Sequence, residues 1–196
     1  MAFTFFFRDN HTLEQVIKHL LPRVEGVQKI KIWDAGCAMG PEPYTFLILL
    51  SEIISYWSFK KIFMDATDID ESDVFGTIIK DGIYSYNELK RIPKEIFQKY
   101  FKKTNNDSQF QINEEVRSKI NFHKHDLTSL KPLATGYNLI ICKNVLLHLE
   151  YKMRVEVYKM FHSVLDSNGI FVSGVSNDIS LLDVCVILID RSSNMR

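Results

Sequence analysis

The chain has 196 residues, of which 46% are hydrophobic, with 24 basic and 24 acidic residues and a formal net charge of zero. This length predicts one globular domain spanning residues 1–196. The balanced charge argues against a nucleic-acid partner bound through a broad phosphate footprint. The most apolar tract, residues 181–189, contains Asp183 and is too short to span a bilayer, so we expect no membrane insertion.

The cysteine and histidine patterns exclude two further classes of protein. Cys37, Cys142 and Cys185 are odd in number and lack a CxxC spacing, which argues against a disulfide framework or a structural zinc site. No secretory signal pattern opens the chain, so a reducing cytoplasm is the expected location. His123 and His125 would share one strand face, but a third ligand is missing there, and we predict no metal site.

The first elements in chain order are a helix, a strand and a second helix. Apolar spacing predicts a helix over residues 12–21, with Thr12 and Gln15 spaced as a capping box. Alternation predicts a strand over residues 29–33. After a turn-rich loop, helical spacing continues to about residue 57, where Trp57 takes the last apolar position.

The same order recurs along the chain. Strands are expected at 62–67 and 137–142, each followed by a helix, at 72–80 and 152–165. The apolar face expected for the last helix consists of Val155, Tyr158, Phe161 and Leu165. This alternation predicts an α/β fold with a mostly parallel sheet covered on both faces.

Two parts of the chain depart from this alternation. Residues 170–174 and 184–189 read as strands with no helical pattern between them, which predicts an antiparallel hairpin at the edge of the sheet. Residues 83–119 show only a helix near 93–101 and a polar turn, which indicates a small inserted subdomain.

The loop after the first strand carries the strongest chemical signal. Asp34, Gly36 and Gly40 lie between a strand and a helix, where a backbone that turns sharply beside a ligand needs glycine. The loop matches neither the GxGxxG pattern of dinucleotide sites nor a Walker motif. A turn whose glycines serve geometry alone is the alternative.

A second acidic position follows the next strand. Asp68 lies 34 residues after Asp34, and a carboxylate at the end of a strand can accept both hydroxyls of a ribose. A nucleoside without phosphate therefore fits this pair. The alternative is that the acidic residues of 65–73 are the exposed start of a helix, which suits Asp70 and Asp73.

Several segments together resemble one family. They are residues 4–8 (TFFFR), 32–37 (IWDAGC) with 42–44 (EPY), 66–70 (ATDID), 82–84 (GIY) and 141–146 (ICKNVL), with a weaker match at 169–177. In this order they resemble the CheR chemotaxis receptor methyltransferases. The resemblance implies a class I, Rossmann-like methyltransferase fold, S-adenosylmethionine as methyl donor, receptor cytoplasmic helices as partners and their glutamate side chains as acceptors.

The resemblance also implies roles for single residues. The expected cofactor-binding set is Thr4, Arg8, Gly36, Glu42, Asp68, Asp126, Leu127 and Asn144. In this set Arg8 suits the carboxylate of the donor, Glu42 its amino group and Asp68 its ribose, while residues 126–127 lie beside the adenine. Lys143 and His148 occupy the positions of an arginine and a tyrosine at the reaction centre and are the expected catalytic pair.

This sequence differs from the family pattern at several of these places. Residues 38–41 read Ala-Met-Gly-Pro where the family has Ser-Thr-Gly-Glu, no glycine occurs in 102–111, and the family's N-terminal helical domain has no counterpart here. A lysine does not replace the bidentate fork of an arginine. Two alternatives follow from these differences: a methyltransferase with another acceptor, and a non-catalytic module that binds S-adenosylmethionine or S-adenosylhomocysteine.

Overall fold

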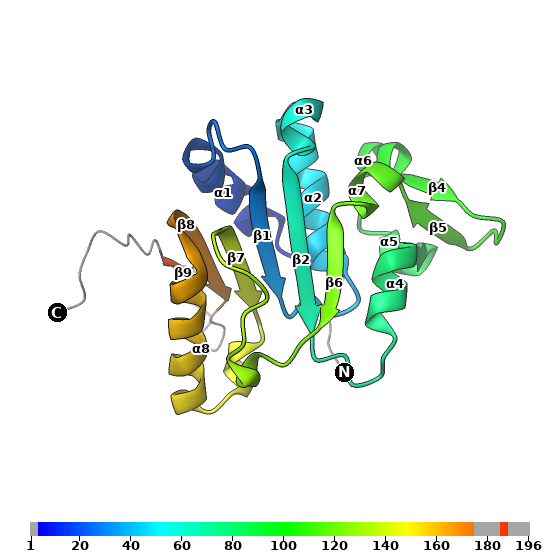
Figure 1. Cartoon of the computed structure of the whole chain (residues 1–196). Helices are drawn as coiled ribbons and strands as arrows, with labels where there is room; N and C mark the ends of the chain where they lie inside the picture. Colours follow the sequence, from blue (N-terminus) through cyan, green and yellow to red (C-terminus); the bar gives the residue numbers. More distant parts are fainter. Residues whose placement is uncertain (1–3, 175–184, 188–196) are drawn as a thin grey trace.

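The computed structural model describes residues 4–174 and 185–187, which form a layered α/β fold (Figure 1). The main sheet has the strand order β6-β2-β1-β7-β8-β9. Its strands are β1 (Ile30–Ala35), β2 (Ile62–Asp68), β6 (Ile120–Lys124), β7 (Tyr137–Lys143), β8 (Leu165–Gly174) and β9 (Cys185–Ile187). The first five strands are parallel, and β9 pairs antiparallel with β8. These pairings confirm the predicted sheet and its antiparallel edge. The rest of the predicted strand 184–189 lies outside the described residues.

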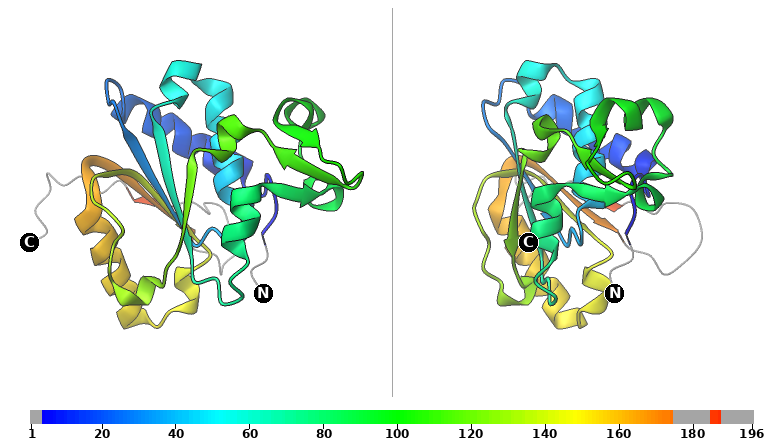
Figure 2. Two further views of the ribbon diagram at one scale, coloured as in Figure 1. Left: turned by 45° about the vertical axis from the view of Figure 1, so that its right-hand side comes forward. Right: turned by 90° about the vertical axis from the view of Figure 1, so that its right-hand side faces the viewer.

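Helices cover both faces of this sheet (Figures 1 and 2). They are α1 (Asn10–Leu20), α2 (Pro41–Ile53), α3 (Tyr56–Phe59), α4 (Phe75–Asp81) and α8 (Tyr151–Val164). Successive side chains of β1 point to opposite faces of the sheet. Ile32 packs in the hydrophobic cluster that includes residues of α1 and α2, whereas Trp33 packs against Phe161 of α8. No helix in the described ranges is long and apolar enough to cross a membrane.

Several helix boundaries differ from the prediction, including the start of α4, which is Phe75 and not residue 72. Helix α1 begins at Asn10, after Asp9, so the capping box expected from Thr12 and Gln15 is wrong. Helix α2 ends at Ile53 because the next residue is extended, and a serine then caps the separate helix α3. Trp57 consequently points outward, with 72% of its surface exposed.

The buried face of α8 also differs from the prediction. It consists of Val157, Met160, Phe161 and Val164, and of the predicted positions only Phe161 belongs to it. Tyr158 is half-buried and packs against this core: its ring meets Phe171 edge-on and its hydroxyl lies 3.4 Å from that of the buried Ser173. The hydroxyl of a tyrosine that packs on a core usually finds a polar partner in this way. Leu165 is buried as the first residue of β8.

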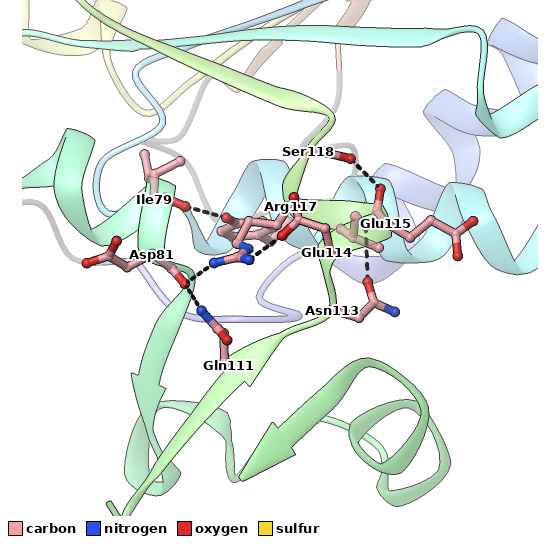
Figure 3. A network of polar contacts seen from close by, with 10 residues as sticks. Ile79, Asp81, Gln111, Asn113, Glu114, Glu115, Arg117 and Ser118 are labelled. Atoms are coloured by element: carbon pink, nitrogen blue, oxygen red, sulfur yellow. Dashed lines mark hydrogen bonds and ion pairs between the residues drawn. The ribbon is translucent and has the colours of Figure 1, made fainter. Parts of the chain in front are cut away.

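A second, antiparallel sheet lies beside the first, within the predicted insertion. Its order is β3-β5-β4, and its elements are β3 (Ile83–Ser85), α5 (Tyr86–Leu89), α6 (Lys94–Tyr100), β4 (Phe101–Lys103), β5 (Gln109–Ile112) and α7 (Glu114–Arg117). Arg117 pairs with Glu114 and donates at 3.0 Å to the carbonyl of Asp81, which also accepts from Gln111 at 2.8 Å (Figure 3). These bonds fasten the inserted subdomain to the end of α4.

Candidate active site

Two adjoining cavities open at the edge of the main sheet where β1, β2 and β7 end. They have volumes of about 540 and 330 Å³ and share Gly36, Asp68, Val145 and His148 in their walls. Such an edge is where open parallel sheets bind ligands. Every predicted site residue lines at least one cavity: Thr4, Arg8, Gly36, Glu42, Asp68, Asp126, Leu127, Lys143, Asn144 and His148.

The loop between β1 and α2 is held against the end of β2. The backbone N–H groups of Gly36 and Cys37 donate to the carbonyl of Thr67, at 2.7 and 3.0 Å. Asp68 accepts from the N–H of Ala38 at 2.9 Å and from that of Asp70 at 3.2 Å, one bond on each carboxylate oxygen. Each oxygen retains a further lone pair. Asp68 therefore shapes the loop and still presents acceptors at the cavity wall.

The neighbouring acidic residues support the helix start instead. Asp70 is 3% exposed and accepts from the N–H groups of Val74 and Phe75, at 3.1 and 3.0 Å, where α4 begins. Asp73 pairs with Lys124 at the surface. Asp70 therefore belongs to the start of α4 as the alternative interpretation expects, although it is buried and not exposed, whereas Asp73 is exposed.

Asp34 is a buried carboxylate beneath the site. It is 1% exposed, and neither of its oxygens has a hydrogen-bond partner among the described residues. Burial, and then the negative charge of Glu42, raise the pKa of Asp34 well above its ordinary value, while Lys143 opposes the shift. The predicted site set lacked Asp34, and the structure places Asp34 within β1, where the sequence predicted the loop after the strand.

We expect Asp34→Asn to remove a pH dependence of stability. Because the pKa of Asp34 is raised in the folded chain, the folded state keeps a proton that the unfolded state releases above about pH 4. Stability should therefore fall as the pH rises through the folded pKa, by up to about 1.4 kcal/mol per unit. Urea unfolding of both proteins at pH 5 and pH 8 measures this difference, and parallel profiles would contradict it.

A buried ion cluster crosses the larger cavity. The Lys143 ammonium lies 2.5 Å from Oδ2 of Asp9 and 2.8 Å from Oε2 of Glu42, and its side chain is only 7% exposed. Burial lowers the pKa of Lys143, but the two carboxylates outweigh it and leave the pKa raised. Lys143 is therefore charged. The sequence analysis missed Asp9, which lies 134 positions away and gives no spacing signal.

The remaining predicted residues come from two loops. Asn144 has a φ of +59° and turns the chain after β7 toward the short helix Leu146–His148, which carries His148 to both cavities. Asp126 accepts from the N–H and the hydroxyl of Thr128, both at 2.8 Å, and with Leu127 it lines the smaller cavity.

The N-terminal segment forms one wall of the larger cavity. Thr4, Phe5 and Arg8 line it, and the guanidinium of Arg91 lies 4.1 Å above the ring of Phe5. Phe6, in the same segment, is fully buried, and its ring packs on Tyr84 and Phe101 of the inserted subdomain. We call residues 4–9 the N-terminal strap.

The cysteines and histidines show no further chemistry. Cys37 and Cys142 are free and buried, and burial raises the pKa of each thiol. His123 lies 3.3 Å from Asp65, and the ring of His125, one residue past the end of β6, packs edge-on against Trp33. Within 4–174 and 185–187, no group of three or more histidine, cysteine or acidic residues is placed to hold a metal ion.

The carboxylates of Glu42 and Asp68 on the cavity walls fit a ligand that carries an ammonium group and a ribose. The cavity walls provide a carboxylate partner in Arg8 and an apolar surface in Leu127. The residues present therefore suit S-adenosylmethionine.

Comparisons with known proteins show the family to which this chain belongs. The family model "CheR methyltransferase, SAM binding domain" matches residues 2–189. The chain is 30% identical over 184 residues to the chemotaxis protein methyltransferase of Borreliella burgdorferi, covering 90% of this chain and 64% of that protein. A probable chemotaxis protein methyltransferase of Rhizobium etli is 27% identical over 188 residues, with 91% and 68% covered.

Solved structures show the same fold at low identity. PKMT2 from Rickettsia typhi, in complex with AdoHcy, has a TM-score of 0.51 at 14% identity, over 88% of this chain and 26% of that one. The DszA carbon methyltransferase has a TM-score of 0.54 at 15% identity, over 88% and 37%. With the family match over nearly its whole length, this chain belongs to the CheR methyltransferases and comprises their S-adenosylmethionine-binding domain.

Proposed function

We propose that this domain transfers a methyl group from S-adenosylmethionine to a side-chain carboxylate, namely that of glutamate in the cytoplasmic helices of a chemotaxis-type receptor, in a reducing cytoplasm. The observation that carries the proposal is the convergence of ten predicted residues on two adjoining cavities. The names of the curated relatives support the acceptor class. The free thiols of Cys37 and Cys142 support the location.

The walls of the cavities divide the binding work among a few residues. Arg8 suits the carboxylate of the donor, Glu42 its amino group and Asp68 its ribose hydroxyls, while Leu127 offers an apolar surface to the adenine. The donor supplies an electrophilic methyl group on a sulfonium. All other demands on the site are positional.

The reaction needs orientation and not a proton acceptor. A glutamate carboxylate is already ionised at neutral pH, with an ordinary pKa near about 4.3, so no general base is required. In-line alignment and exclusion of water are what the protein provides. His148 lines both cavities and Lys143 lies at the end of β7, and we assign to them the orientation of the acceptor.

One observation favours a second candidate function. The ammonium of Lys143 is held by Asp9 and Glu42, and a lysine in this state offers an acceptor carboxylate less than a free cation would. A module that binds the donor or its demethylated product without catalysis, or an enzyme with another acceptor, is consistent with that pairing.

Asp68→Ala is expected to weaken binding of S-adenosylhomocysteine by about 1–3 kcal/mol, because ribose hydroxyls lose their acceptors. Isothermal calorimetry on the folded variant measures this loss. Asp73→Ala is the matched control, since Asp73 is an acidic residue of the same segment whose side chain is 74% exposed. Equal affinities for Asp68→Ala and wild type would remove Asp68 from the ribose site.

Methyl transfer is tested with radiolabelled S-adenosylmethionine and a receptor cytoplasmic fragment, with base-labile label as the product. Transfer that Asp68→Ala reduces supports the proposal. Tight binding of the donor without transfer to any receptor fragment would favour the second candidate. Absence of binding by both S-adenosylmethionine and S-adenosylhomocysteine would overturn the proposed function altogether.

A further inference from the structure

One ammonium group in the larger cavity is shared by two carboxylates. Lys143 reaches from the end of β7 to Glu42 on α2 and to Asp9 in the N-terminal strap. Their side chains are 7%, 19% and 33% exposed, respectively, so the lysine is the most deeply buried of the three. Both carboxylates line the cavity wall.

Glu42 has two possible cationic partners in the proposed complex, Lys143 and the amino group of the donor. Glu42 is the residue assigned above to the amino group of the donor, and it already accepts from Lys143 at 2.8 Å. A second ammonium at Glu42 would compete with Lys143 for its oxygens. A buried lysine that loses its only partner is strongly unfavourable, so binding would be weakened unless another acceptor remained.

Asp9 is placed to be that other acceptor. It precedes the first residue of α1, yet within the described chain its carboxylate makes no capping bond to the helix. Its Oδ2 lies 2.5 Å from the Lys143 ammonium. Asp9 thus keeps Lys143 paired whether or not Glu42 is engaged elsewhere.

We propose that Asp9 is a positioning residue for cofactor binding: it retains the Lys143 ammonium while the amino group of the donor takes Glu42. The inference rests on the proposed function. It assigns to Asp9 an effect on the amino-acid end of the ligand and none on the nucleoside end. Lys143 then changes partners within the site without becoming unpaired.

The test compares two ligands on the full chain. S-adenosylhomocysteine carries the amino group, and 5′-methylthioadenosine shares the nucleoside thioether but lacks the amino-acid end. Asp9→Asn should lower the affinity for S-adenosylhomocysteine by about tenfold, which is the scale of one charge-assisted hydrogen bond. The affinity for 5′-methylthioadenosine should change by less than about twofold. Asparagine is close to aspartate in size and is equally acceptable before a helix, so the variant should fold.

A second variant separates positioning from direct contact. In Asp9→Asn combined with Lys143→Met, no ammonium competes for Glu42, and the affinity for S-adenosylhomocysteine should return to within about twofold of wild type. Glu156→Gln removes a carboxylate from the exposed pair with Lys159 and serves as the matched control without effect. A structure with S-adenosylhomocysteine should show Lys143 bonded to Asp9 and Glu42 bonded to the ligand.

The other outcomes overturn the inference in distinct ways. If Asp9→Asn loses the same affinity for both ligands, Asp9 is a structural residue. A double variant as weak as Asp9→Asn would show that Asp9 itself contacts the amino group. If wild type binds neither ligand, the proposed function fails and the inference fails with it.

Discussion

Gly36→Ala is expected to lower the free energy of unfolding by roughly 2–6 kcal/mol, which combines backbone strain with overpacking. The backbone of Gly36 has a φ of +102°, a conformation that residues with a side chain rarely adopt. A Cβ added there would lie 2.0 Å from Cγ2 of Val145, so the side chain of Val145 or the loop after β7 would have to shift. Urea unfolding measures the loss, which approaches the whole stability of many domains.

Two companion variants separate the causes of that loss. Gly136→Ala has a similar positive φ of +73° but nothing within 4 Å of the added Cβ, so it should show the strain alone. Val145→Ala in the Gly36→Ala background removes the closest contact and should restore part of the stability. If Gly36→Ala costs no more than Gly136→Ala, the close approach of the two loops does not determine the stability.

Phe6→Ala should cost about 3–5 kcal/mol of unfolding free energy, the usual range for a large aromatic side chain removed from a core. Phe6 is 0% exposed, and its ring meets those of Tyr84 and Phe101 edge-on, with centroids 4.8 and 5.8 Å away. These rings belong to the inserted subdomain. The truncation should also weaken the binding of S-adenosylhomocysteine, because the N-terminal strap that carries Arg8 would lose its packing on the inserted subdomain.

Phe63→Ala is the matched control for this truncation. Phe63 is 49% exposed, and its closest described cation is Lys29, 4.7 Å from the ring centroid, so its removal should cost under about 1 kcal/mol. A Phe6→Ala protein that is destabilised yet binds S-adenosylhomocysteine as tightly as wild type would show that the strap is positioned by other contacts.

Strands β1, β2, β7 and β8 were predictable because local pattern indicates them, whereas the order of strands in the sheet depends on tertiary packing and was not predicted. Residues such as Ile32 and Trp33 are apolar on both faces of β1, which is what a parallel sheet under helices requires. The helix faces were less predictable. A face read from spacing alone placed Val155 and Tyr158 in the core, whereas Tyr158 is only half-buried. The buried positions of α8 are Val157, Met160, Phe161 and Val164.

The site residues were predictable where each one follows a strand. Asp68 ends β2 and Lys143 ends β7, so a strand pattern brings both to one edge. The partners of Lys143 were not predictable in the same way. Asp9 comes from the N-terminal strap, and its approach depends on the packing of Phe6, which no periodicity encodes. The roles of these residues in binding stay predictions, which the proposed variants would test.

The neck of the inserted subdomain has a consequence for how this domain changes over evolution. Its two ends lie side by side, since the N–H of Ile112 donates to the carbonyl of Gly82 at 2.9 Å and Ile83 pairs with Gln111. The segment between such ends can lengthen, shorten or be exchanged with little entropic cost to the sheet. Changes of length at the tip between β4 and β5 can therefore leave the neck in place, whereas exchange of Tyr84 or Phe101, which pack on Phe6, would loosen the N-terminal strap.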